Sequence, residues 1–425
     1  MKIGLEVHVA LPTKTKLFCG DLAYENQDTP NSNVCPICLG LPGSKPVLNK
    51  KALEVSLDIA HSLNCDIPKK TWFIRKVYFY PDLPKGYQIT QLDGAVGSRG
   101  FVKIKNKKIG IRRVQIEEDP ARITREKEYS LIDFNRSGIP LNEIVTEPDI
   151  SSLEELKEFV DELRSILYYI GVDINQEIKT DLNISLAENR VEIKNVTGIK
   201  NLITAAEYEI KRQSNIISAG KDVYMETRTY NEETGETVSS REKETEEEYG
   251  FIFEPDLTFY ETAFVELKTP IIASDIAVEL SRKSGYSEST LKELIMFNKR
   301  NLEILLKASK DDLPKSIVLI EKFASFGAYV HSYEQFKEML KYDISAMDKQ
   351  QFISLLEGKE TAKDFHADEI ENYVIKLISQ DISLNNRKDE KVVGFLIGKV
   401  KQQYNIDART AGEIVRKAIK GRSGN

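Results

Sequence analysis

The segment KIGLEVHVA, Lys2–Ala10, defines the start of the fold, because every second residue in it is apolar. That period of two is typical of a β-strand with one buried face. The apolar positions are Ile3, Leu5, Val7 and Val9. Glu6 and His8 therefore project together from the opposite face. A carboxylate beside an imidazole is half of a site for a divalent metal, although a histidine on a strand can also be purely structural.

Further β-strand patterns follow at residues 101–104 and 109–116, interrupted by one amphipathic helix at 50–63. At Ser151 the pattern changes. Ser151 and Glu154 match a capping box, and an apolar stripe of helical period then runs to Gly171. More β signals and a helix are predicted at residues 182–186, 191–193 and 202–217. The acidic stretch at 242–254 is interpreted as surface, in the simplest case a solvated loop.

After residue 271 almost every segment has helical periodicity. The predicted helices near the end of the chain cover residues 367–379, 390–403 and 409–419. We therefore expect an α+β protein in three parts. A mixed or antiparallel sheet domain at 1–270 precedes a helical domain at 271–342 and a small helical tail domain at 343–425.

Length and composition set the class of protein. The chain has 425 residues, 41% hydrophobic and 30% charged, which suits about two or three folded domains. No apolar run approaches the roughly 20 residues of a membrane span, and the first residues do not resemble a secretory leader. Four cysteines are too few for a disulfide framework. A soluble cytoplasmic protein without a membrane partner is the expectation.

Charge is distributed unevenly along the chain. Residues 385–425 contain ten Lys and Arg against four Asp and Glu, a net charge of +6. The total is −7, so the preceding residues carry −7 − (+6) = −13. A basic end on an acidic body indicates an RNA-contacting module or, alternatively, a solvated helical surface. The candidate RNA contacts are Lys399, Lys401, Arg409, Arg416 and Lys417.

Two groups of residues could bind metals. Glu117 and Glu118 end the strand pattern at 109–116, and Glu143 follows the loop at 135–138. If these acids converge with Glu6 and His8 they suit Mg²⁺; otherwise they are solvated strand ends. The second group pairs a CxxC turn with a distant cysteine and an aspartate, which either binds Zn²⁺ or is a loop that has lost its metal. Its members are Cys19, Asp21, Cys35 and Cys38.

Residues 75–88 combine cations, tyrosines and prolines. Such a surface could hold phosphate or stack a base, or it could be a structural loop lined by aromatic rings. No GxxxxGK[ST] phosphate loop occurs in the chain, so a nucleotide site would be of an unusual kind.

Long motifs in order along the chain carry a resemblance to a known family. They are GLEVHV (4–9), LFCG (17–20), NVCPICLGLPGSKPVLNKKA (33–52), YFYPDLPKGYQIT (78–90), EED (117–119), SLIDFNRSGIPLNEIVTEPDI (130–150), VEIKNV (191–196), ETRTYNEETGET (226–237), FEPD (253–256) and GFLIGKV (394–400). With them the chain resembles the B subunits of tRNA-dependent amidotransferases, the GatB/GatE family. The resemblance implies a cradle domain, a helical domain and a YqeY-like tail domain that grips tRNA.

The resemblance also implies an activity, that of a carbon–nitrogen ligase with glutamine as nitrogen donor. The B subunit of this family phosphorylates the side-chain carboxylate of Glu-tRNA(Gln) or Asp-tRNA(Asn) with ATP. An amidase A subunit supplies the ammonia that displaces the phosphate, and a small C subunit completes the heterotrimer. Which misacylated tRNA is used does not follow from the sequence.

By the same resemblance, Glu6, His8, Glu143 and an acid of the EED motif, Glu117 or Glu118, form the magnesium-binding kinase site. The residues assigned to ATP are Arg75, Tyr80, Lys85, Tyr87 and Lys194. Asp21 stands where zinc-binding members of the family usually have a cysteine. Two other classes stay open: a non-catalytic tRNA-binding scaffold, and a zinc hydrolase, which the thiolate-rich loop disfavours because it offers no open position beside a base.

Overall fold

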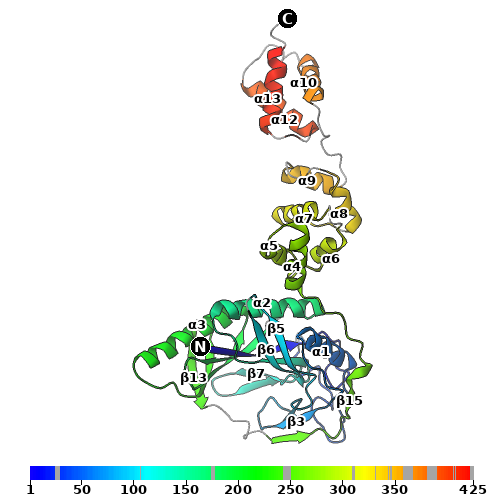
Figure 1. The fold of residues 1–425 in the computed structure, drawn as a ribbon. Coiled ribbons are helices and arrows are strands. Elements are labelled where there is room, and N and C mark those ends of the chain that lie inside the picture. The colour runs from blue at the N-terminus through cyan, green and yellow to red at the C-terminus, as the bar shows by residue number, and fades with distance from the viewer. Residues whose placement is uncertain are drawn as a thin grey trace. The chain divides into compact units, whose positions relative to one another are not determined.

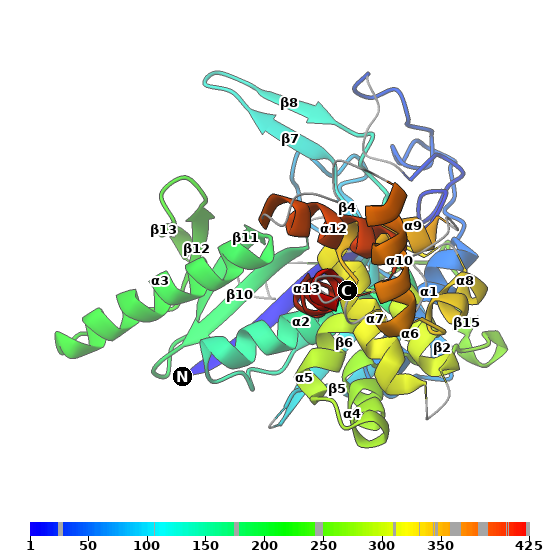
Figure 2. The ribbon, with the colours of Figure 1, turned by 90° about the horizontal axis from the view of Figure 1, so that it is seen from above.

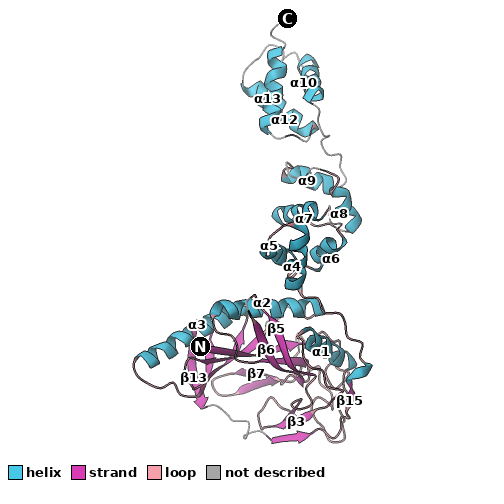
Figure 3. Cartoon of the chain, in the orientation of Figure 1, coloured by secondary structure: helices cyan, strands magenta, loops and turns pink. Residues whose placement is uncertain are grey.

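The structure is a computed structural model that describes residues 1–23, 29–105, 107–173, 178–242, 250–308, 312–330, 332–342, 344, 347–357, 367–380, 390–404, 406 and 408–421. The chain divides into two compact units, Met1–Ile276 and Ala277–Asn425. The first combines strands and helices, and the second is helical in its described parts (Figure 3). The expected α+β class is confirmed at this level. The boundary expected at residue 343 lies outside the described residues, and the three-part division stays a prediction.

An eight-stranded sheet forms the framework of the first unit, with the order β13-β12-β11-β10-β1-β9-β6-β5. Only β11 and β12 run parallel among these neighbours, so the sheet is mixed, as expected. The first strand pattern in the sequence is confirmed, because β1 covers Lys2–Ala10 and lies in the interior of the sheet. The others are β5 (Gly97–Lys103), β6 (Lys108–Glu118), β9 (Pro140–Thr146), β10 (Lys179–Ser185), β11 (Val191–Thr197), β12 (Glu226–Asn231) and β13 (Glu236–Glu242).

Three helices cover one face of this sheet, α1 (Lys50–Ser62), α2 (Leu153–Ile170) and α3 (Ile199–Ser218) (Figure 1). The alternate residues of β1 enter the hydrophobic core that forms between the helices and the sheet. Each large aliphatic side chain buried there stabilises the fold by about 1.5–3 kcal/mol. The opposite face of the sheet is left to Glu6, His8 and the polar residues of the neighbouring strands.

Helix α2 begins one residue later than the capping box in the sequence predicts. Its N-cap is Ser152, whose side chain accepts a hydrogen bond from the backbone N–H of Glu155. Ser151 instead donates to the Glu155 carboxylate from its backbone N–H and its hydroxyl. The predicted end is confirmed: Gly171 has φ 107°, a conformation in which a side chain would be strained.

Smaller sheets surround the polar face of the first unit. One has the order β14-β3-β4, and β7 and β8 form a hairpin that extends away from the main sheet (Figure 2). Within the acidic stretch at 242–254, residues 243–249 lie outside the described residues. Gly250–Phe253 are exposed, as expected, but they form β14 against β3 rather than a loop, and Glu254 is fully buried. The bounds are β2 (Lys70–Thr71), β3 (Ile74–Val77), β4 (Tyr87–Thr90), β7 (Arg122–Arg125), β8 (Ser130–Asp133), β14 (Gly250–Phe253) and β15 (Tyr260–Glu261).

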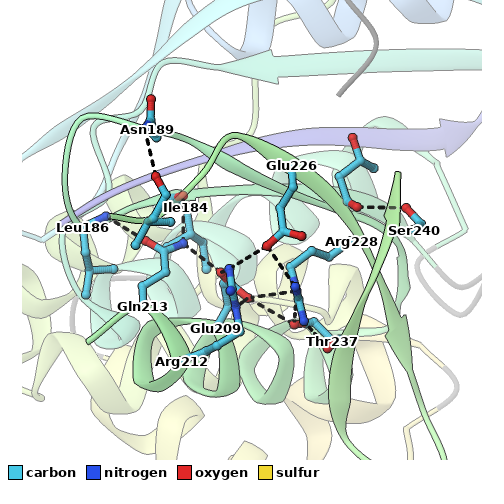
Figure 4. A network of polar contacts seen from close by, with 12 residues as sticks. Ile184, Leu186, Asn189, Glu209, Arg212, Gln213, Glu226, Arg228, Thr237 and Ser240 are labelled. Atoms are coloured by element: carbon cyan, nitrogen blue, oxygen red, sulfur yellow. Dashed lines mark hydrogen bonds and ion pairs between the residues drawn. The ribbon is translucent and has the colours of Figure 1, made fainter. Parts of the chain in front are cut away.

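A buried polar network fastens α3 to strands β12 and β13 (Figure 4). Glu209 is fully buried and accepts two hydrogen bonds from the Arg212 guanidinium, at 2.7 and 2.9 Å. Gln213 and Thr237 donate to the same carboxylate, and Arg228 lies 3.6 Å from it. Both carboxylate oxygens of Glu209 are thus satisfied, which is the condition for burying a carboxylate.

The second unit confirms the helical pattern predicted after residue 271. The last three helices share a core that includes Ile370, Leu396 and Val415. Within the described ranges, no helix is long and apolar enough to cross a lipid bilayer. The helices are α4 (Ala273–Ser284), α5 (Glu288–Ile295), α6 (Lys299–Lys307), α7 (Leu313–Phe326), α8 (Tyr333–Met339), α9 (Lys349–Leu356), α10 (Ala367–Gln380), α12 (Glu390–Gln403) and α13 (Ala408–Gly421).

Candidate functional site

Strand register brings three of the predicted metal ligands together. His8 on β1 lies opposite Glu143 on β9, and β9 in turn pairs with β6, which carries Glu117. The His8 Nε2 lies 3.4 Å from a Glu117 oxygen and 3.9 Å from a Glu143 oxygen. One donor atom from each of the three residues lies within 4.8 Å of the other two. That spacing is close to the roughly 4.2 Å between opposite ligands of a Mg²⁺ ion.

The three side chains of this group shift one another's pKa values. Burial opposes protonation of His8, but its hydrogen bond to Glu117 and the charges of Glu143 and Glu117 outweigh this and raise its pKa to about 10. Burial alone would raise the pKa of Glu117, but the hydrogen bond and the charge interaction with His8 lower this pKa below its usual value. Burial and the Glu117 charge raise the pKa of Glu143 to about 7. The two buried carboxylates thus favour a nearby positive charge, and protonated His8 supplies one.

Neighbouring side chains hold the two carboxylates in place. The amide nitrogen of Gln115 donates to Glu143 over 2.6 Å, and the hydroxyl of Thr90 donates to Glu117 over 3.2 Å. The Gln115 oxygen is buried and has no hydrogen-bond partner in the described part of the chain. A metal-bound water in this group would supply the missing donor, so the residues fit a hydrated Mg²⁺.

The remaining two predicted ligands lie elsewhere. Glu118 is directed away from His8 and is bound by Lys85 and by the backbone N–H of Ile89. Glu6 belongs to a second group, with Asp181 on β10 and Glu192 on β11. Sequence reasoning missed both of these acids, although Glu192 lies in the VEIKNV motif that carried the resemblance. Antiparallel pairing sets Glu6 opposite Asp181, and no local pattern shows this.

Lys194 lies inside the second acidic group. Its Nζ is 3.2 Å from Asp181 and 3.3 Å from Glu192. Burial disfavours its charged form, but Asp181 and Glu192 outweigh that effect and raise its pKa above the ordinary value. The group therefore contains one positive charge beside its three acidic side chains.

The other residues assigned to ATP form two separate contacts. The Arg75 guanidinium lies over the Tyr87 ring at 4.5 Å and pairs with Glu254 through two 2.8 Å hydrogen bonds. Lys85 lies 5.6 Å from the same ring centroid, so these residues share one surface beside Glu118. Tyr80 lies apart from them, because its hydroxyl accepts a hydrogen bond from Arg125 on the β7–β8 hairpin.

The cysteine loop brings all four predicted ligands together. One donor atom each from Cys19, Asp21, Cys35 and Cys38 lies within 4.8 Å of the rest. The Cys38 sulfur is 3.6 Å from the Cys35 sulfur and 3.0 Å from an Asp21 oxygen. Two sulfurs around tetrahedral zinc are about 3.8 Å apart, so the donor set fits Zn²⁺ without a large movement.

The predicted RNA contacts lie on the last two helices of the second unit. Arg409, Arg416 and Lys417 are exposed on α13, and Lys417 pairs with Glu371 at 2.5 Å. Lys399 and Lys401 are partly buried on α12, where the Lys399 ammonium lies 5.8 Å from the Phe395 ring centroid. The exposed Phe395 offers an aromatic face next to this cation.

Comparison with known proteins identifies the family. A family described as the GatB/GatE catalytic domain matches residues 1–265, more than half of the chain. The chain belongs to the GatB/GatE family. The matched residues contain both acidic groups and the cysteine loop.

Two relatives of this family are named as B subunits of aspartyl/glutamyl-tRNA(Asn/Gln) amidotransferase. The protein of Methanoregula boonei is 49% identical over 269 residues, which cover 60% of this chain and 56% of the relative. The alignment therefore spans little more than half the length of that protein. The protein of Sulfolobus acidocaldarius is 34% identical over 471 aligned positions that cover 99% of both chains. The GatB/GatE likeness thus extends into the helical unit.

Proposed function

We propose that this GatB/GatE protein is the B subunit of a tRNA-dependent amidotransferase and phosphorylates the side-chain carboxylate of Glu-tRNA(Gln), Asp-tRNA(Asn) or both. ATP donates its γ-phosphoryl group, and ammonia released from glutamine by an amidase A subunit then displaces the phosphate to give the amide. A small C subunit completes the complex. The convergence of His8, Glu117 and Glu143 within the matched domain is the observation that carries this proposal.

These three side chains would hold Mg²⁺. A bound Mg²⁺ would neutralise the charge that develops on the transferred phosphoryl group. The chain's own contribution is positioning. Gln115 and Thr90 fix the two carboxylates, and the sheet sets the distance between β1 and β9.

The nucleotide would bind beside this group, where Arg75, Tyr87 and Lys85 share one surface. A tyrosine ring can stack a base. Arg75 and Lys85 can bind phosphates if their ion pairs with Glu254 and Glu118 are broken. Lys194 reaches the acidic face from the other side, through Asp181 and Glu192. The cysteine loop would bind a structural Zn²⁺, because a fully coordinated ion stabilises a loop and leaves no open catalytic position.

A Glu143→Ala variant of the assembled three-subunit complex tests the proposal. It should lose ATP-dependent phosphorylation of Glu-tRNA and keep the glutaminase activity of the amidase subunit. Glu126→Ala, an exposed glutamate between β7 and β8, is the matched control and should retain both activities. Unchanged phosphorylation in Glu143→Ala would refute the kinase site. A wild-type complex that binds Glu-tRNA without consuming ATP would favour the tRNA-binding scaffold.

A further inference from the structure

A cavity opens on the polar face of the main sheet next to Glu6. It encloses about 200 Å³, several times the roughly 30 Å³ that one water molecule occupies. Residues from β1, β9 and β10 line it, together with the turn between β10 and β11. Its charged and amide side chains are Lys2, Glu6, Arg112, Asn183, Glu188 and Arg190.

Asn183 gives this cavity an unmet hydrogen-bonding requirement. The residue is 7% exposed, and its amide nitrogen donates to Glu6 over 3.2 Å. Its amide oxygen is buried and has no partner among the described residues. Buried polar atoms in proteins are normally satisfied by protein, water or ligand. The Asn183 oxygen and the Glu6 carboxylate both accept hydrogen bonds, so together they suit a ligand group that carries N–H donors and a positive charge.

The cavity also has a cationic side. Lys2 and Arg190 are both exposed, and neither forms an ion pair with another described residue. Arg112 differs, because it pairs with Glu147 at 2.8 Å. Lys2 and Arg190 are therefore available to an anionic group of a ligand that enters from solvent.

Strand β1 sets the order of these groups. Lys2, Glu6 and His8 project from the same face, and residues two apart on a strand are separated by about 6.6 Å. The phosphorylation site proposed at His8 thus lies one such step from the Glu6 carboxylate. In a glutamyl group one carbon–nitrogen bond and three carbon–carbon bonds separate the α-nitrogen from the carboxylate carbon of the side chain, a span of similar size.

We infer that this cavity binds the aminoacyl end of the charged tRNA, with the α-ammonium group on Asn183 and Glu6. Lys2 and Arg190 bind phosphate of the terminal nucleotides, and the substrate's side-chain carboxylate then lies at the His8 group. The inference rests on the proposed function and adds that the α-ammonium group is recognised directly. Asn183 is a specificity-determining residue in this arrangement.

Deamination of the substrate tests the inference. Treatment of Glu-tRNA(Gln) with nitrous acid replaces the α-ammonium group by a hydroxyl of similar size. With the wild-type complex, kcat/KM for phosphorylation of the deaminated tRNA should be lower than for Glu-tRNA by about 10-fold or more, because a charge-assisted hydrogen bond is lost. The KM for ATP should not change. Equal use of the two substrates would overturn the inference and leave the proposed function standing.

The Asn183→Leu variant supplies a second readout. Leucine removes the amide oxygen at similar size, so Glu-tRNA should lose its advantage and the two substrates should react at nearly the same kcat/KM. A variant that still prefers Glu-tRNA as strongly as the wild type would contradict the role of Asn183. If Asn183→Leu does not fold, the wild-type comparison still decides. If the wild-type complex phosphorylates neither tRNA, the proposed function and the inference both fail.

The cationic side is tested by Arg190→Ala. It should raise the KM for Glu-tRNA about 3-fold to 10-fold and leave the KM for ATP unchanged, since one phosphate contact is lost. Arg99→Ala is the matched control, because Arg99 is also an exposed arginine, on β5, where it pairs with Asp66. An equal effect of both substitutions would show that only overall charge matters and would remove Arg190 from the site.

Discussion

Lys85 binds Glu118 through both carboxylate oxygens, at 2.5 and 2.6 Å from its Nζ. Both side chains are buried, with 8% and 7% exposure. The Glu118 carboxylate also accepts the backbone N–H of Ile89, which ties β4 to the end of β6. Only one of the two neighbouring glutamates in the EED motif faces His8, because successive residues of a strand point to different sides. The ion pair with Lys85 holds Glu118 on the other side.

The first prediction concerns this ion pair. Lys85→Met should lower the free energy of unfolding of the first unit by about 3–5 kcal/mol, because it leaves the Glu118 carboxylate buried without its cation. Denaturation followed by the fluorescence of Trp72, the single tryptophan of the chain, measures this unit. Adding Glu118→Gln should restore part of the loss. A double variant that is less stable than Lys85→Met would contradict the explanation.

The second prediction concerns the network of Figure 4. Glu209→Ala should destabilise the first unit by about 3–5 kcal/mol, since Arg212 and Arg228 would lose their shared buried anion. Glu207→Ala is the matched control on the same helix, and its exposed side chain should change stability by less than about 0.5 kcal/mol. The same Trp72 fluorescence reports both variants, and similar losses would show that the buried contacts of Glu209 are not the cause.

The third prediction is that Mg²⁺ binding releases protons. In the metal-free protein His8 and Glu143 have raised pKa values of about 10 and about 7, so near neutral pH the histidine and part of the glutamate population are protonated. Metal ligands must be deprotonated, so Mg²⁺ affinity should rise with pH by up to about 10-fold per pH unit for each proton released. Calorimetry in buffers of different ionisation enthalpy counts these protons. A proton count of zero would separate His8 from the metal.

Local periodicity predicts those parts of the fold that are set by local sequence. The alternation in Lys2–Ala10 and the apolar stripe of α2 predicted the bounds of these two elements almost to the residue. Burial of one face imposes a period of two on a strand and of about 3.6 on a helix. The hairpin β7–β8 was not predicted, because it is largely exposed and lacks that pattern. The edge strand β13 and its neighbour β12 were also not predicted.

The site was less predictable than the fold, because register is a long-range property. Asp181 meets Glu6 only through the pairing of β10 with β1, and nothing in the residues around Asp181 indicates it. Glu117 and Glu118 are equally acidic in sequence, and only the pleat and Lys85 separate their roles. The cysteine loop was easier, since its CxxC turn fixes two donors locally.

The fourth prediction concerns zinc in the cysteine loop. The purified chain should contain about one Zn²⁺, and Asp21→Cys should tighten its binding by at least about 10-fold, because a thiolate is a softer ligand than a carboxylate. Competition with a chromophoric chelator measures the affinity. Asp21→Ala should weaken binding in the same assay. If neither substitution changes the affinity, Asp21 is not a ligand.

The fifth prediction concerns the tail, which we propose is a separate tRNA-binding domain at residues 343–425. Phosphate contacts release counterions, so affinity for Glu-tRNA should fall steeply with salt. Deleting 343–425 should weaken tRNA binding and flatten the salt slope, while ATP chemistry in the first unit continues. Alanine at Lys399, Lys401, Arg409, Arg416 and Lys417 together should reduce the slope by up to about 4, at roughly 0.9 per phosphate contact.

A control for the tail replaces basic residues of the helices before it. Lys307 on α6 and Lys337 on α8 carry the same charge, and their replacement by alanine should change the salt slope much less. Binding measured at two salt concentrations separates the cases. A solvated helical surface predicts an unchanged dissociation constant and slope on deletion, whereas a tail that grips tRNA predicts that both change, since only direct phosphate contacts contribute to the slope.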